Sequence, residues 1–203
     1  MNNSISVKNL TKKYSHFTLD NLSLEVPSGS VIGLVGANGA GKTTLIKLLL
    51  GIIKKDKGNI YIIDKEDIGI ILDDAFLPEL LKIDDINKIM KNIYQNWDET
   101  LFYQYLQRFN LTNNLLIKSL SKGMKKKLEI AVSLAHKPKL LILDEPTSGL
   151  DPIVRGEVLD IFREFMESDD HSILISSHIT SDLESIADYI ALLDQGKLIF
   201  KES

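Results

Sequence analysis

The sequence predicts an α/β fold with a mainly parallel sheet, an antiparallel layer of strands near the N-terminus and an inserted segment of helices. Three nearly continuous apolar runs end in polar residues, which is the pattern of strands buried on both faces of a parallel sheet. These runs are residues 30–36, 139–146 and 171–178. Residues 5–10 and 17–26 alternate between apolar and polar side chains, which predicts antiparallel strands. Residues 84–137 carry apolar side chains at helical spacing.

The ends of the apolar runs indicate where a ligand would bind. In an open parallel sheet, ligands bind outside the carboxyl ends of the strands. The residues expected to converge at that edge are Gly36, Asp144, Glu145 and His178.

The helical segment predicts two helices before residue 110. Asp98 is placed to cap the second of them. The apolar positions of the first are Ile86, Ile89, Met90, Ile93 and Trp97, and those of the second are Leu101, Phe102, Tyr105, Leu106 and Phe109. We expect these side chains to form core. Near the C-terminus, residues 189–200 predict a hairpin that turns at Gln195 and Gly196.

Composition places the chain among globular proteins. Its 203 residues are 44% hydrophobic, and 24 Lys and Arg against 28 Asp and Glu give a net charge of -4. Without a basic excess, a nucleic-acid partner is not expected. The absence of cysteine excludes disulfides and thiol chemistry. Because the sequence has neither an apolar signal core nor a run near the roughly 20 apolar residues of a membrane helix, we expect a cytoplasmic protein.

A phosphate-binding loop explains the small residues after the first apolar run. Residues 36–43 satisfy G-x-x-x-x-G-K-[ST] between a predicted strand and a helix-compatible run. Bare backbone at Gly39 and Gly41 lets amide groups approach a phosphate, Lys42 adds a charge, and the hydroxyl of Thr43 can ligate magnesium. The expected nucleotide-binding residues are Gly36, Ala37, Asn38, Gly39, Ala40, Gly41, Lys42, Thr43 and Thr44. On its own, the loop would fit kinases, GTPases and motors equally well.

Two adjacent carboxylates follow the second apolar run. Alternation along a strand points them in different directions, so Asp144 can hold magnesium while Glu145 acts as a general base towards water. At the end of the third run, His178 can donate a hydrogen bond to a γ-phosphate. The alternatives are an acidic surface turn and a structural histidine. His16, His136 and His171 receive only the structural interpretation.

Residues 120–152, LSKGMKKKLEIAVSLAHKPKLLILDEPTSGLDP, strongly resemble the ATP-binding cassette family. ATPase domains of that family carry an LSGGQ-like signature before a carboxylate strand and an SGLD segment after it. The likeness covers almost the whole chain: Tyr14 matches an aromatic that stacks on adenine, residues 36–43 match the phosphate loop, and residues 176–178 match the switch histidine. SKGMKKKL and DEPTSGLDP are most similar to the bacterial export branch, which serves peptides, antibiotics and similar cargo.

The resemblance implies a P-loop NTPase core and one domain over residues 1–203. The core would comprise residues 1–73 and 137–203, and a helical subdomain about residues 74–136. ATP and Mg²⁺ would be bound, and hydrolysis would power transport through a separate transmembrane permease. The chain would then lie on the inner face of the cell membrane.

The signature supplies a second anion site. Ser121 can cap the following helix and Gly123 leaves its backbone open. In the family, a head-to-tail dimer sandwiches each ATP between the phosphate loop of one subunit and the signature of the other. The resemblance therefore implies such a dimer, of identical or related chains, with residues 148–151 along its seam.

Three departures from the family pattern stand out. Lys122 and Met124 replace a glycine and a glutamine of the signature, and we expect both side chains to face away from the phosphate. Asp73 replaces a glutamine; it could still ligate magnesium, or it is merely a loop acid. The next residues, 74–77, would meet the membrane partner, with Phe76 and Leu77 as exposed apolar anchors or as part of the core.

Rival interpretations remain at this point. A chromosome or repair ATPase would need a long heptad insertion, and a ribosome-acting factor would need two cassettes. Neither fits well, because the chain has one phosphate loop and no long heptad run. A nucleotide-binding regulator with negligible turnover is kept open by Asp73. The chain stops just after the predicted hairpin, where family members commonly continue, so we expect an accessory C-terminal domain to be absent or removed.

Overall fold

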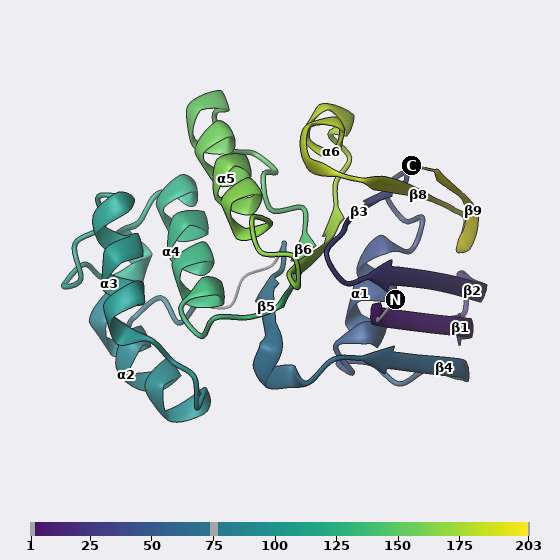
Figure 1. Cartoon of the computed structure of the whole chain (residues 1–203), viewed down its shortest axis with the longest axis horizontal. Coiled ribbons are helices and arrows are strands. Elements are labelled where there is room, and N and C mark those ends of the chain that lie inside the picture. Colours follow the sequence, from purple (N-terminus) through teal and green to yellow (C-terminus); the bar gives the residue numbers. More distant parts are fainter. Residues whose placement is uncertain (1–2, 74–76, 203) are drawn as a thin grey trace.

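A computed structural model describes residues 3–73 and 77–202 (Figure 1). The elements are β1 (Asn3–Lys13), β2 (Thr18–Pro27), β3 (Val31–Val35), α1 (Lys42–Leu49), β4 (Lys57–Ile62), η1 (Lys65–Asp67), β5 (Ile68–Ile71), α2 (Ile83–Ile93), α3 (Glu99–Arg108), η2 (Ile117–Ser119), α4 (Lys122–Leu134), β6 (Leu140–Asp144), α5 (Pro152–Phe165), β7 (Ser172–Ser176), α6 (Thr180–Ile186), β8 (Tyr189–Asp194) and β9 (Lys197–Glu202). In these described residues no helix is both long and apolar enough to cross a membrane.

A six-stranded sheet forms the centre of the molecule, in the order β5-β6-β7-β3-β8-β9. The first five strands of that order run parallel, and β9 pairs antiparallel with β8. The predicted parallel runs are therefore confirmed as neighbours. Gln195 and Gly196 have φ of 44° and 79°, so the predicted hairpin turn is confirmed too.

A second sheet is antiparallel, in the order β2-β1-β4. Its first two strands confirm the predicted N-terminal layer. Strand β4 was not predicted from the sequence. Its residues alternate between exposed and half-buried, and none is fully buried, so its apolar pattern is weak. It joins the sheet by pairing with β1; for example, Ile62 of β4 pairs with Ile5 of β1.

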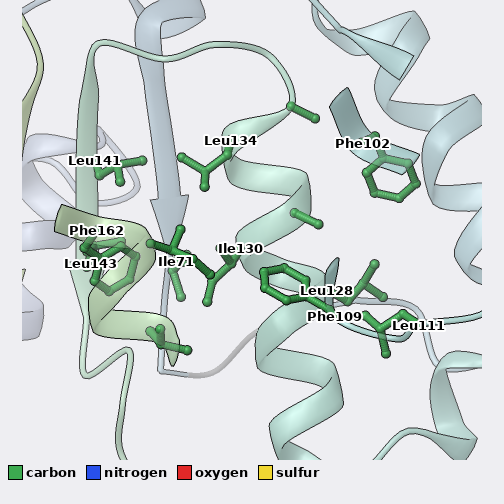
Figure 2. Packing of buried hydrophobic residues seen from close by; sticks show 14 of the residues in the cluster. Ile71, Phe102, Phe109, Leu111, Leu128, Ile130, Leu134, Leu141, Leu143 and Phe162 are labelled. Carbon is green, nitrogen blue, oxygen red and sulfur yellow. The ribbon is translucent and has the colours of Figure 1, made fainter. Parts of the chain in front are cut away.

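Apolar side chains cover both faces of the central sheet. Along β6, Leu141 and Leu143 join a cluster with helices α3, α4 and α5, whereas Leu140 and Ile142 join a second cluster with α1 and the antiparallel sheet. Figure 2 shows the first cluster, in which Ile130 of α4 lies beside Ile71 of β5, while Leu128 lies beside Phe109 and Leu111. That cluster continues from the helices into the sheet. The division between core and helical subdomain at residues 74 and 136 stays a prediction.

The helical segment corrects two sequence expectations. Asp98 caps α3 as predicted, because its Oδ1 accepts a hydrogen bond from the Leu101 amide at 2.9 Å. Helix α2, however, ends at Ile93, so Trp97 lies in the connection that follows it. Ile89 and Ile93 are 40% and 57% exposed and are not core. Only the stripe of α2 that faces α3 and α4 is buried, which leaves the other apolar positions at the surface.

Candidate nucleotide-binding and hydrolysis site

A cavity of about 510 Å³ lies at the carboxyl ends of β3 and β6. Its lining brings together most of the residues that the sequence predicted for the nucleotide. The lining residues are Tyr14, His16, Phe17, Ala37, Asn38, Gly39, Gly41, Lys42, Thr43, Thr44, Asp73 and Glu145. The remaining phosphate-loop residues, Gly36 and Ala40, do not line the cavity, and Ala40 is buried in the second core cluster. Position 36 must be glycine, because a Cβ there would lie 2.4 Å from the Leu193 carbonyl oxygen.

The phosphate loop joins β3 to α1, as the motif requires. Gly41 caps α1 with φ of 114°, a left-handed backbone conformation that favours glycine. A Cβ at this position would also lie 2.8 Å from the Phe17 ring. The glycine therefore leaves the backbone amides at the helix N-terminus uncovered by a side chain, which suits the binding of an anionic phosphate.

Lys42 places a positive charge inside the loop. The residue is only 7% exposed, and its Nζ donates to the carbonyl oxygens of Gly36 at 2.6 Å and Ala37 at 3.4 Å. The same Nζ lies 3.9 Å from Oε1 of Glu145. A buried ammonium held by carbonyl groups at the cavity wall is suited to pairing with phosphate oxygens.

A cluster of oxygen atoms lies where the loop meets β6. Asp144 is 1% exposed, and its two carboxylate oxygens accept hydrogen bonds from the hydroxyls of Thr43 at 2.8 Å and Ser176 at 2.5 Å. Asp73 lines the same cavity. Magnesium prefers oxygen ligands, so a hydroxyl and carboxylates fit this ion. Ser176 entered the sequence analysis only as a family match, and its bond to Asp144 was not foreseen.

Glu145 lines the cavity and pairs with His178, which does not line the cavity itself. Glu145 adopts a left-handed backbone conformation with φ of 50°, and its Oε2 lies 2.7 Å from Nδ1 of His178. The same Oε2 accepts a bond from the His178 amide at 3.3 Å. Because a carboxylate only accepts hydrogen bonds, Nδ1 carries the hydrogen in this contact. The pair thus combines a proton acceptor with an oriented imidazole.

Aromatic side chains from the connection between β1 and β2 form the outer wall. Tyr14 is 46% exposed, and its ring lies 6.4 Å from that of Phe17. Such a surface can stack against a nucleobase. His16 and Phe17 also line the cavity, although the sequence analysis assigned neither to the site. In the sequence, only their aromatic rings, two and three residues after Tyr14, could have indicated that they belong to the site.

Ser121 and Gly123 do not line this cavity. Ser121 caps α4 as predicted, because its Oγ accepts a bond from the Met124 amide at 3.2 Å. The Lys122 side chain reaches the loop between β6 and α5, because a Cβ placed on Gly149 would lie 2.4 Å from Nζ of Lys122. Met124 is half-buried and packs against the core. One chain therefore holds the signature apart from its own phosphate loop.

Helix α4 also contacts the strand that leads to Asp73. Lys126 is 5% exposed, and its Nζ contacts the Leu72 carbonyl at 3.5 Å and Glu129 at 2.8 Å. Burial raises the pKa of Glu129, and the Lys126 charge opposes that rise. Leu77 packs against the core. The predicted membrane contacts Asp74, Ala75 and Phe76 lie outside the described residues.

Together these features define a class of protein. A bare loop between strand and helix, a buried lysine, a hydroxyl–carboxylate oxygen cluster and a glutamate at the cavity wall are the parts of a P-loop nucleoside triphosphatase. The comparisons with known proteins then identify the family within that class.

Relatives in sequence are transport ATP-binding proteins. A family model described as "ABC transporter" matches residues 19–148. The chain is 38% identical over 208 residues to the lantibiotic transport ATP-binding protein SrtF of Streptococcus pyogenes, with 98% of this chain and 90% of the relative covered. It is 37% identical to the bacitracin transport ATP-binding protein BcrA of Bacillus licheniformis, with 98% of this chain and 69% of BcrA covered.

Solved structures agree in fold. A structure titled "Structure of ATP binding subunit of ABC transporter" matches with a TM-score of 0.89 and 27% identity, covering 98% of this chain and 89% of the other. The bacterial cassette MJ0796, solved as a dimer, matches in fold with a TM-score of 0.87 at 21% identity, covering 98% of both chains. The chain belongs to the ABC transporter family and is an ATP-hydrolysing, ATP-binding subunit of such a transporter. Membership implies a dimer and a membrane partner.

Proposed function

We propose that this ATPase powers export of a peptide or antibiotic through a separate transmembrane permease, on the cytoplasmic face of the cell membrane. The observation that carries this proposal is the likeness to proteins named for lantibiotic and bacitracin transport, over 98% of the chain in both cases. Those names favour transport over the non-transport cassette functions.

The residues of the cavity have distinct binding roles in this proposal. Tyr14 stacks on the adenine, and the amides of residues 36–44 together with Lys42 hold the phosphates. Thr43, Asp144 and Asp73 would hold Mg²⁺ through their side-chain oxygens. When bound, the ion neutralises charge that develops on the phosphate oxygens.

Glu145 and His178 carry the hydrolytic step. The Glu145 carboxylate accepts a proton from the attacking water, which then forms a bond to the γ-phosphorus as the bond to the β-phosphate oxygen breaks. His178 is oriented by its bond to Glu145 at 2.7 Å. Since Nδ1 is bonded to Glu145, the donor to the γ-phosphate is Nε2 of the imidazolium form, in which both ring nitrogens carry a hydrogen, while Lys42 lies beside the phosphates.

The site is completed by a second subunit. Ser121 caps α4, and Gly123 in the first turn has no side chain; both lie outside the cavity of their own chain. We propose that they bind the γ-phosphate held by the partner in a head-to-tail dimer, with residues 148–151 at the seam.

Glu145→Gln tests the hydrolytic assignment. We expect the rate of ATP hydrolysis to fall by roughly 100-fold to 1000-fold because the amide cannot accept the proton. Affinity for ATP should remain, and size-exclusion chromatography with light scattering should show a dimer in the presence of Mg²⁺ and ATP. Glu157→Gln is the control, since Glu157 is an exposed carboxylate on α5. A Glu145→Gln protein that hydrolyses ATP as fast as the parent refutes the assignment.

A further inference from the structure

Two segments that follow neighbouring strands are connected by two side-chain contacts beside the cavity. Strands β6 and β7 pair in parallel, and residues 145–147 and 178–182 follow them. The first link is the contact between Glu145 and His178. The second is a hydrogen bond of 2.6 Å from the Thr147 hydroxyl to Oδ2 of Asp182.

The two links differ in burial. The His178 side chain is 52% exposed, so its position depends on a single contact at the surface of the site. Thr147 and Asp182 are each only 1% exposed. A buried carboxylate must be paired to be tolerated, which makes its geometry much more restrictive than that of an exposed contact.

Asp182 is paired on both oxygens. Its Oδ1 accepts a bond of 2.5 Å from Nε of Arg155, and the same guanidinium donates to the Ser181 hydroxyl at 2.8 Å. The Asp182 amide donates to the Ile179 carbonyl at 3.2 Å, which folds the backbone tightly behind His178. Asp182 thereby joins three parts of the chain: the loop after Glu145, helix α5 and the turn that carries His178.

We propose that Asp182 is a positioning residue for hydrolysis, which holds the His178 segment against Glu145 by binding Thr147 and Arg155. This proposal rests on the proposed roles of Glu145 and His178. Asp182 itself does not line the cavity. Its effect is exerted on His178 through the backbone between residues 178 and 182.

The test compares Thr147→Val with Thr147→Ser in the full chain. Valine keeps the shape but removes the hydroxyl, so we expect kcat for ATP hydrolysis to fall about tenfold, as small misplacements of catalytic groups do. KM for ATP should stay within about twofold, because Lys42 and the phosphate loop are untouched. Serine restores the hydroxyl and should restore kcat. Asp160→Asn, which removes an exposed carboxylate of α5, is the control for general effects of charge.

A double-mutant cycle separates positioning from a structural defect. If Asp182 acts through His178, adding Thr147→Val to His178→Ala should cause no further loss of kcat. A loss that multiplies in the double mutant, or a kcat unchanged by Thr147→Val, overturns the proposal. The single variant His178→Ala tests the proposed function by itself: a parental rate there refutes the role of His178 whatever Thr147→Val does.

Arg155→Lys keeps the proposal testable if Thr147→Val does not fold. Lysine retains the charge beside Asp182 but loses the two-nitrogen contact of the guanidinium. Arg155 is 28% exposed, so the change is milder than a core substitution. We expect kcat to fall about threefold with KM unchanged, again without effect in the His178→Ala background. A parental kcat in Arg155→Lys contradicts the proposal.

Discussion

Asp73 is the residue at which this chain departs most from the pattern of its family. It lies two residues after the end of β5, is exposed, and lines the cavity together with Thr43 and Glu145. A carboxylate brings a formal charge and a shorter reach than glutamine, yet it offers the same kind of oxygen ligand to magnesium. Because Asp73 lines the cavity, its proposed role as a magnesium ligand can be tested directly.

We predict that Asp73→Ala lowers kcat about tenfold and raises the Mg²⁺ concentration needed for half-maximal ATPase activity. Asp73→Gln should keep kcat within about threefold of the parent, because the amide oxygen still reaches the cavity. A Mg²⁺ titration of ATPase activity measures both. Asp20→Ala removes an exposed carboxylate that does not line the cavity and serves as control. Parental Mg²⁺ dependence in Asp73→Ala would mean that this residue is merely a loop acid.

The predicted site residues that the structure places in or beside the cavity are those whose neighbours in the chain explain them. Lys42 and Thr43 stand in a contiguous motif, and Asp144 and Glu145 end an apolar strand. Asp182 was missed because its partners, Thr147 and Arg155, lie 35 and 27 positions away. No local pattern marks a buried carboxylate of this kind, since its burial depends on contacts made only in the folded chain.

At the scale of elements, α2 leaves an apolar surface unpaired. Ile93 at its end is 57% exposed and Ile70 on β5 is 39% exposed. Both line a groove of about 290 Å³ with residues from α1 and β4. The other lining residues are Leu49, Leu50, Ile62, Lys65, Glu66, Ile68 and Tyr94. Because membership of the family implies a membrane partner, we predict that a segment of the proposed permease covers this groove.

Ile93→Glu should separate the subunit from its permease without harming the ATPase. A carboxylate in an apolar groove loses hydration when the groove is covered, so docking is disfavoured while the free subunit is unaffected. Copurification of the permease from membranes should fall at least tenfold, with the ATPase rate of the isolated subunit unchanged. Ile199→Glu is the matched control, because Ile199 is 58% exposed on β9 and does not line the groove. Equal copurification of both variants contradicts this assignment.

Helices and strands could be predicted from the sequence where their side chains are buried on one face only or on all faces. The strands ending at Val35, Asp144 and Ser176 are apolar along nearly their whole length, and Asp98 marks the start of α3 by its own hydrogen bond. The end of α2 was not predictable, because an apolar pattern runs on past Ile93 while the backbone turns to an extended conformation at Tyr94. Tertiary contacts of the helix, not its composition, decide where it stops.

Taken as a whole, each chain carries two helix starts that we propose as anion-binding sites, the phosphate loop and the signature. The phosphate loop opens α1, and the signature opens α4. Figure 1 shows the two helices on opposite sides of the central strands, with α4 beside β5 and α1 beside the antiparallel sheet. A dimer related by two-fold symmetry would join the loop of each copy to the signature of the other and so form two equivalent sites.

This arrangement predicts that two inactive chains restore each other. Lys42→Ala removes the charge that holds the phosphates, and Gly123→Asp puts a carboxylate at the signature. A Cβ at Gly123 meets only Val154 side-chain atoms at 3.6 and 3.7 Å, so the second variant should fold. A mixed dimer has one site with both defects and one intact site. If copies pair at random, an equal mixture should recover about a quarter of parental ATPase activity.

Mixing Lys42→Ala with Glu145→Gln provides the matched control, because both changes lie on the same half of the site. Lys42 and Glu145 line one cavity within one chain, 3.9 Å apart. Every site in that mixed dimer then carries one defect, so no activity should return. Recovery in the first mixture and not in the second requires a site built by two subunits. Activity of Gly123→Asp on its own would instead mean that each chain hydrolyses ATP within its own boundaries, because this variant leaves the phosphate loop of its own chain intact.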